Sequence, residues 1–216
     1  MPLVEFTMKK ISINIAALLL CHVLFAQKTL ASEFKIVKKQ GNIVLYERWI
    51  TGSTGESVRE LKAEFSVKSN TENVIDLLKN QPEGTKWNMN ASMYKIAKTS
   101  REDEWINYIK YGMPAMMDDQ ECCLLYKVAP SFSGQQNVVI KFESTLSPLF
   151  PVNPDVKRIT GVKGQWILQQ QSNKSLKVTY LITSDKSSNI PRFVSDPIIR
   201  GNLLKTIESF RDILEK

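Results

Sequence analysis

The sequence predicts an α+β protein in which a curved antiparallel β-sheet wraps around one long C-terminal helix. Two observations favour this fold. Most of the chain alternates apolar and polar residues with the period of a strand, whereas residues 191–216 carry the longest helical pattern. One long helix after many strands must bury its apolar stripe against the sheet.

The apolar residues of the terminal segment recur at steps of three and four, so they share one helix face: Ile199, Leu203, Ile207, Phe210 and Leu214. Asp196 and Pro197 predict the helix start, because a carboxylate caps free N–H groups and the proline ring presets φ. Pro191 could open an earlier turn, which would leave a bend near Pro197 that could serve as a hinge.

The first 31 residues have the layout of a secretory signal peptide. Lys9 and Lys10 give a basic start, and residues 11–26 form an apolar run with few interruptions. The run is too short to span a bilayer comfortably. We therefore expect an exported protein, periplasmic or extracellular.

The expected cleavage point follows Ala31, with Ala26 as the alternative, and Met8 offers a second translation start. Leu20 stands before Cys21, where a lipid-attachment site needs a small residue, which argues against lipidation. Residues 32–216 remain as one domain, long enough to bury a sizeable core.

The charge of the mature chain is modestly positive. Cleavage after Ala31 removes three of 29 basic residues and one of 22 acidic residues, which leaves +5. The cations are scattered, with no run beyond Lys38-Lys39, so nucleic acid is not an expected partner. We expect a monomer that touches a membrane transiently.

Histidine is missing from residues 32–216, because the only one is His22. That excludes imidazole general bases and histidine metal ligands from the mature domain. Cys122 and Cys123 are neighbours and point to opposite faces of a strand, so we interpret them as small apolar fillers. No catalytic residue, metal site or cofactor is predicted.

The chain order consists of two strands, a short helical insert, at least six further strands and the long helix. Residues 43–50 and 57–67 form the first hairpin, and a capping box at 69–72 predicts a helix through Lys79 that ends at Pro82–Gly84. Residues 147–155 hold three prolines and form a loop. The other predicted strands pair as hairpins: 91–99 with 104–112, 122–129 with 137–146, and 157–171 with 176–185.

Several local motifs occur in an order that resembles the START family of lipid-transfer domains, within the helix-grip superfamily. Trp87-Asn88 follows the helical insert, and Tyr108 precedes Met113-Pro114. Asp119-Gln120-Glu121 resembles the family's Arg-Asp pattern, with Gln120-Glu121 in place of that pair. The closing motifs are Gly164-Gln-Trp166, the strand 177–184, Ile190-Pro191 and the final helix.

The resemblance covers roughly residues 33–216 and implies a cavity between sheet and helix that binds a hydrophobic molecule. The polar network around Gln120-Glu121 is expected to differ from the family's, and the long N-terminal helix of many members is missing. The candidate lining residues are Trp87, Tyr108, Met113, Met116, Phe142, Trp166, Tyr180, Phe193, Leu203 and Ile207. Each of them alone would equally suit ordinary core packing.

Two other functions remain open at this point. An enzyme of the cyclase or hydrolase type could use the same cavity, with Tyr108 or an acidic residue as the proton-transfer group. Asp118-Asp119 with Glu121 is the acidic cluster that could serve, although a solvated loop is its simpler interpretation. Alternatively, the cavity could be filled by the protein's own side chains, as in an interaction module.

Overall fold

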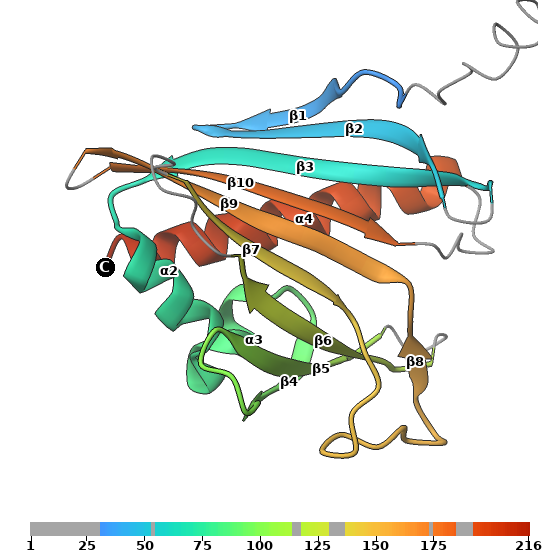
Figure 1. Cartoon of the computed structure of the whole chain (residues 1–216). Helices are drawn as coiled ribbons and strands as arrows, with labels where there is room; N and C mark the ends of the chain where they lie inside the picture. Colours follow the sequence, from blue (N-terminus) through green and yellow to red (C-terminus); the bar gives the residue numbers. More distant parts are fainter. Residues whose placement is uncertain (1–30, 53–54, 114–117, 130–136, 173–174, 185–191) are drawn as a thin grey trace, which may run out of the picture.

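The computed structural model describes residues 31–52, 55–113, 118–129, 137–172, 175–184 and 192–216, with the side chains of 192–194 left out. Ten strands form a single sheet, and α4 lies along one of its faces (Figure 1). This arrangement confirms the predicted α+β class. The strands are β1 (Lys35–Gln40), β2 (Ile43–Thr51), β3 (Ser57–Val67), β4 (Ala91–Lys98), β5 (Glu104–Tyr111), β6 (Gln120–Val128), β7 (Asn137–Ser144), β8 (Lys157–Ile159), β9 (Val162–Ser172) and β10 (Ser175–Ser184).

The sheet joins the beginning of the described chain to its end. Its order is β1-β2-β3-β10-β9-β7-β6-β5-β4, and β3 pairs antiparallel with β10. Ala63 on β3 lies opposite Tyr180 on β10, which in turn lies opposite Trp166 on β9. Inward side chains from distant parts of the sequence are thereby placed on one surface under α4.

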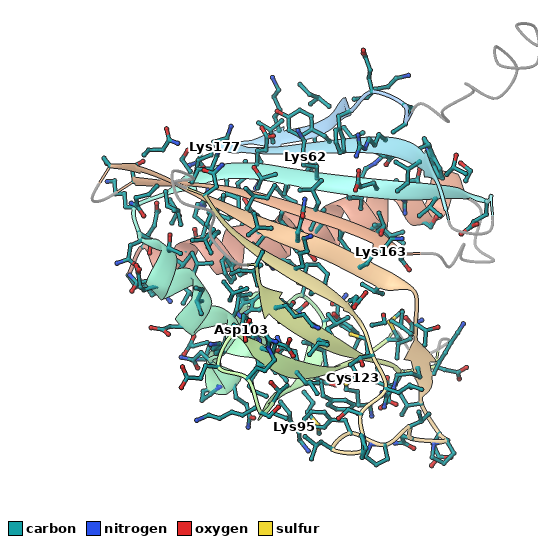
Figure 2. The ribbon with its side chains drawn as sticks, viewed as in Figure 1. Lys62, Lys95, Asp103, Cys123, Lys163 and Lys177 are labelled. Carbon is teal, nitrogen blue, oxygen red and sulfur yellow. The ribbon has the colours of Figure 1, made fainter. Side chains whose placement is uncertain are left out.

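Alternation along the strands separates a buried face from a solvated face, as the sequence predicts. On β3, Leu61, Ala63 and Phe65 are buried, while Lys62 between them is only partly buried. Lys62 and Lys177, both labelled in Figure 2, stand on the face away from α4. The inward residues form one continuous core with the helix.

The helical insert has two helices where one was predicted. Asn70, not Ser69, caps α2 (Thr71–Leu78), because its side chain accepts a hydrogen bond from the Asn73 N–H at 2.8 Å. Asn80 caps α3 (Gln81–Trp87) in the same way. Pro82 lies in the first turn of α3, where a missing N–H costs nothing, so its interpretation as a helix stop was wrong.

Two strand predictions also need correction. The segment before Gly41 was not assigned as a strand, yet β1 pairs with β2 there. The predicted strand 157–171 is broken at Gly161, whose φ is +74°, so that β8 leaves β9 and pairs in parallel with β6. This break positions Ile159 and Val162 at the rim of the cavity described below.

The terminal helix α4 (Arg192–Leu214) starts four residues before Asp196. Pro197 therefore lies inside the helix, and the predicted capping role of Asp196 was wrong. Asp196 instead forms an ion pair with Arg59 on β3. No helix in the described part of the chain is long and apolar enough to cross a membrane.

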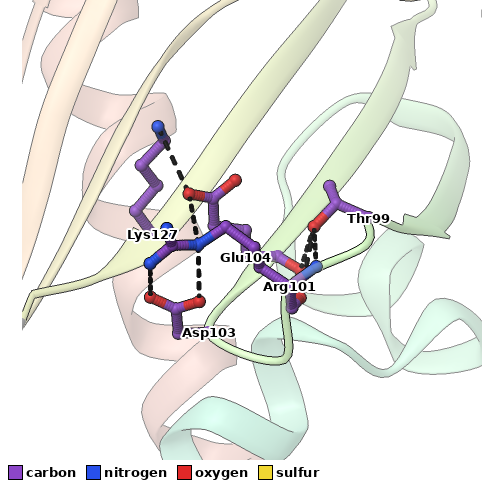
Figure 3. A network of polar contacts seen from close by, with 5 residues as sticks. All are labelled: Thr99, Arg101, Asp103, Glu104 and Lys127. Atoms are coloured by element: carbon purple, nitrogen blue, oxygen red, sulfur yellow. Dashed lines mark hydrogen bonds and ion pairs between the residues drawn. The ribbon is translucent and has the colours of Figure 1, made fainter.

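Polar contacts fix the turn between β4 and β5 (Figure 3). Arg101 donates two hydrogen bonds to the Asp103 carboxylate, at 3.0 and 2.8 Å, and Lys127 lies 3.3 Å from Glu104. The Thr99 hydroxyl accepts a hydrogen bond from the Arg101 N–H. Arg101 and Lys127 are exposed, while Asp103 and Glu104 are partly buried, so we expect the network to shape the turn and to add little stability.

Candidate ligand-binding cavity

A cavity of about 610 Å³ lies between the inward face of the sheet and α4. The sheet contributes Ile109, Leu124, Trp166 and Tyr180 among its lining residues, and α4 contributes Leu203. Most of these side chains are apolar because they occupy the inward positions of alternating strands. The volume lies within the usual range of small-molecule sites, about 300–1,000 Å³.

Aromatic rings close one end of the cavity. Phe210 on α4 packs against Trp87 and Trp166, with ring centroids 5.0 and 4.8 Å apart. The chain of ring contacts continues from Trp166 to Tyr180 at 4.4 Å. Phe210, Trp87 and Trp166 are nearly fully buried and Tyr180 is partly buried, so aromatic side chains close this end.

The wall near the start of α4 is charged. Arg59 on β3 lies 2.5 Å from Asp196 and 3.9 Å from Glu47 on β2. Arg200, one turn after Asp196, lies 3.0 Å from Glu47 and 3.6 Å from Asp196. The two carboxylates are almost completely buried, and Arg59 and Asp196 line the cavity.

This charged cluster, defined as Glu47, Arg59, Asp196 and Arg200, gives the cavity a polar end. Ser195, Thr183 and Asn202 line the same region. A buried charge without a partner would be costly, so mutual pairing is what allows four charges to stand next to an apolar cavity. The cavity is therefore amphipathic along its length.

The ionisable groups that line the apolar part stay neutral at physiological pH. Burial raises the pKa of the Cys122 thiol to about 12, even though a hydrogen bond with Tyr111 lowers it. Burial likewise raises the pKa values of Tyr111, Tyr126 and Tyr180 above their ordinary range. These side chains offer neutral hydrogen-bonding groups, not a thiolate nucleophile.

Five of the ten predicted lining residues do line the cavity: Trp87, Met113, Trp166, Tyr180 and Leu203. Phe142 and Ile207 are buried in the adjacent core without lining it; Phe142 stacks between Tyr126 and Tyr180. Met116 lies outside the described residues. The side chain of Phe193 does as well, although its position belongs to α4.

Tyr108 lies on the opposite face of the sheet, which corrects its predicted place in the lining. Its neighbours Ile109 and Tyr111 line the cavity, but Tyr108 stacks on Phe150 at 5.2 Å. Its hydroxyl donates a hydrogen bond of 2.6 Å to the fully buried carboxylate of Glu121. Alternation along β5 explains the error, since adjacent strand residues face opposite ways.

Glu121 organises the proline-rich loop that follows β7. Besides the bond from Tyr108, it accepts one from Arg158 Nε at 2.8 Å and one from the Asn153 N–H at 3.2 Å. The second guanidinium nitrogen of Arg158 reaches the carbonyl oxygens of Phe150 and Pro151. Glu121, around which the polar network is expected to differ from that of the START family, thus pairs with an arginine from β8.

Sequence reasoning missed the charged cluster and several lining residues, including Tyr126 and Cys122. A signal for the cluster was present. Glu47 follows Ile43 and Leu45 on the inward side of β2, and Arg59 precedes Leu61 on β3. A charge in the apolar register of a strand predicts a buried partner across the fold.

The outer face of the sheet carries a second hollow, of about 670 Å³. Its lining mixes apolar residues with charged residues of the β4–β5 turn and of β6, β7 and β9, among them Arg101, Lys127 and Glu143. Their side chains are largely solvated, in contrast to the closed aromatic end of the inner cavity. The inner cavity is therefore the better candidate for a hydrophobic ligand.

Known proteins with a similar architecture were found by structure. A STAR-related lipid transfer protein from Xanthomonas axonopodis superposes with a TM-score of 0.72 at 19% identity, covering 86% of this chain and 100% of that one. The chain has a START-like, helix-grip fold. The likeness is too distant in sequence to show more than the fold.

Two further similar proteins were found, one by sequence and one by structure. An uncharacterized protein of Pseudomonas aeruginosa is 22% identical over 195 residues, which is 88% of this chain and 91% of that protein. An aromatase/cyclase from Streptomyces has a TM-score of 0.52 at 8% identity, covering 73% of this chain and 94% of that one. No family model matches the sequence.

Proposed function

We propose that this START-like domain binds a lipid or another hydrophobic small molecule in the inner cavity and transfers it between membranes. The observation that carries the proposal is the 610 Å³ cavity, apolar at one end and charged at the other. Burying about 300 Å² of hydrocarbon contributes roughly 7 kcal/mol before association costs. The lipid-transfer domain of similar fold from Xanthomonas axonopodis supports the same reading.

The test is extraction of the purified protein with organic solvent, followed by mass spectrometry of the extract. We expect one class of hydrophobic molecule in near-stoichiometric amount, or its uptake from a mixed lipid extract. The matched variant is Leu203→Trp, which places a larger side chain in the cavity wall and should abolish uptake. A wild-type protein that takes up no lipid would overturn the proposal.

We propose binding, not catalysis, as the activity. The cavity-lining thiol and phenols are held neutral by burial, and Tyr108, the proton-transfer candidate, lies outside the cavity. The aromatase/cyclase of similar fold makes the alternative worth testing. The bound molecule should be recovered with its mass unchanged after prolonged incubation, and a changed mass would favour the enzyme.

We propose that the protein meets membranes through the loop between β7 and β8. Leu146, Leu149 and Val152 are 75%, 61% and 53% exposed there, beside the exposed Lys157. Ile159 follows in β8 and lines the cavity, which connects this loop to the cavity rim. Apolar tips with a cation beside them suit a bilayer that contains anionic lipid.

Co-sedimentation with phosphatidylcholine–phosphatidylglycerol vesicles tests this contact. The double variant Leu146→Ser/Leu149→Ser should lose most of the vesicle-bound fraction. Ile36→Ser is the matched control, because Ile36 is 52% exposed on β1, at the far edge of the sheet from that loop. Equal losses for both variants, or no loss for the double variant, would contradict the assigned surface.

We also propose export to the periplasm or the extracellular space, supported by the signal-peptide layout of residues 1–31, which lie almost wholly outside the described structure. The mass of the protein recovered from the cell envelope should correspond to a chain that starts at Ser32. Recovery of the uncleaved chain from the cytoplasm would contradict it.

A further inference from the structure

One end of the cavity is charged and the other end is aromatic. All four members of the charged cluster bridge β2, β3 and α4, and the two that line the cavity, Arg59 and Asp196, form the closest pair. The opposite end is closed by Phe210 on Trp87 and Trp166. An amphiphile would therefore enter with its apolar part toward the rings and leave its polar head beside the cluster.

The cluster disfavours an anionic head. Each arginine already contacts both carboxylates, at 2.5 and 3.9 Å for Arg59 and at 3.0 and 3.6 Å for Arg200. A ligand carboxylate or phosphate would have to compete for these guanidinium groups while lying next to Glu47 and Asp196. Removing one partner of a buried pair, or adding a like charge to it, is costly in a low dielectric.

Hydrogen-bonding groups without a charge are available in the same region. Ser195 is buried and lines the cavity, and Asn202 lines it further along α4. Hydroxyl and amide side chains can donate to and accept from a ligand hydroxyl. They offer an uncharged head the bonds that it loses on leaving water.

We infer that this cavity selects an amphiphile with an uncharged, hydroxyl-type head, and that the cluster of Glu47, Arg59, Asp196 and Arg200 is its head-group subsite. The inference rests on the proposed lipid-binding function and specifies its ligand class. Neither the family resemblance nor the structures of similar fold assign these four residues.

A competition between two ligands that differ only in their head tests the inference. The protein is incubated with equal amounts of isotope-labelled oleyl alcohol and oleate at pH 7.5, separated by gel filtration, extracted and quantified. We expect oleyl alcohol to be retained in preference to oleate. Retention of oleate at least as well as of the alcohol would overturn the inference and leave the proposed function standing.

Two substitutions in the cluster, one that removes a negative charge and one that removes a positive charge, give a second test of the inference. Asp196→Asn frees a guanidinium for the oleate carboxylate, so the retained ratio should shift toward oleate by about ten- to a hundredfold, the value of one hydrogen bond to a charged group. Arg200→Gln removes a cation and should shift the ratio further toward the alcohol. Asp212→Asn is the control, because Asp212 is exposed near the other end of α4.

The results distinguish a failure of the proposed function from a failure of the head-group subsite. A wild-type protein that retains neither ligand and no phospholipid fails the proposed function itself. Variants that are folded by circular dichroism and retain oleyl alcohol, but leave the ratio unchanged, would overturn the subsite. If Asp196→Asn does not fold, the wild-type preference and Arg200→Gln still decide, since the Arg200 side chain is 27% exposed and its loss is milder.

Discussion

At the residue scale, the most consequential side chain outside the cavity is Glu121. Its carboxylate is completely buried and accepts hydrogen bonds from Tyr108, Arg158 and the Asn153 backbone. A buried carboxylate with three donors, one of them a guanidinium, fixes the loop that holds the exposed apolar residues 146–152. The stability of the protein and the position of this loop are thus coupled through one acid.

Glu121→Gln should lower the free energy of unfolding by about 3–5 kcal/mol, because it leaves the Arg158 guanidinium buried without its counter-charge. Urea denaturation at pH 7 measures this loss. Glu143→Gln is the matched control on the same sheet; Glu143 is exposed, so its replacement should change stability by less than about 0.5 kcal/mol. Comparable losses in the two variants would contradict the role given to Glu121.

Glu121 should also make the protein sensitive to acid. Burial alone would raise its pKa, but hydrogen bonds from Tyr108 and Arg158 outweigh burial and hold it below the ordinary value of 4.5. The unfolded chain therefore binds the proton more readily, so this stability is present above pH 4.5 and is lost as the pH falls through the lowered pKa. The wild-type protein should lose more stability below pH 4.5 than Glu121→Gln does.

Cys122 provides a third residue-scale prediction. Because burial raises the pKa of its thiol from 9.0 to about 12, its thiolate fraction at pH 8 is about a thousandfold below that of an ordinary thiol. Alkylation by iodoacetamide, followed by mass spectrometry, should be slower by a similar factor in the native protein than in urea. Rapid native labelling of Cys122 would show that the cavity wall opens far more than this structure indicates.

At the scale of the elements, β9 depends on a glycine where it passes between β7 and β10. A Cβ on Gly164 would overlap the Leu181 carbonyl oxygen and the ring of Phe142. Close packing therefore explains why the Gly164-Gln-Trp166 motif begins with a glycine. Phe142 can stack between two tyrosines because the neighbouring strand presents no side chain there.

Gly164→Ala should destabilise the protein by about 1–3 kcal/mol through this overlap. Gly201→Ala is the matched control within α4, where nothing lies within 4 Å of the added atom. That change should stabilise the protein by about 0.5–1 kcal/mol through helix propensity. Thermal unfolding of both variants reports the signs, and equal signs would contradict the packing argument.

At the scale of the whole molecule, two sets of long-range contacts hold the fold together. One is the antiparallel pairing of β3 with β10. The other is the ring cluster of Phe210 with Trp87 and Trp166, which fastens the end of α4 to the helical insert and to β9. The cavity lies between these two sets of contacts, where the sheet and the helix diverge. Its closed end therefore depends on the ring cluster.

Phe210→Ala should lower the free energy of unfolding by about 3–5 kcal/mol, the usual cost of deleting a buried phenyl ring. It should also speed the release of bound lipid, because it opens the closed end of the cavity. Ile198→Ala on the same helix is the control, since Ile198 is 56% exposed. Stopped-flow transfer of a bound lipid to acceptor vesicles measures the release rate.

The α+β class, the hairpins and the terminal helix can be predicted from the sequence alone. These follow from local periodicity and turn residues, which any stretch of chain carries without reference to the rest. Alternation placed Trp166 and Tyr180 on inward faces, and the helical spacing placed Leu203 on the buried stripe. All three line the cavity.

Which inward residues border the cavity, and which charges pair, depends on how the elements pack against one another. Ile207 and Leu203 share a helix stripe, yet one is core and the other is cavity wall, because the gap between sheet and helix has a position that no periodicity encodes. Arg59 and Asp196 are separated by 137 positions. Their pairing exists because β3 and β10 are neighbours and α4 returns across them, and long-range pairing of this kind is a property of the packed molecule, not of any local segment.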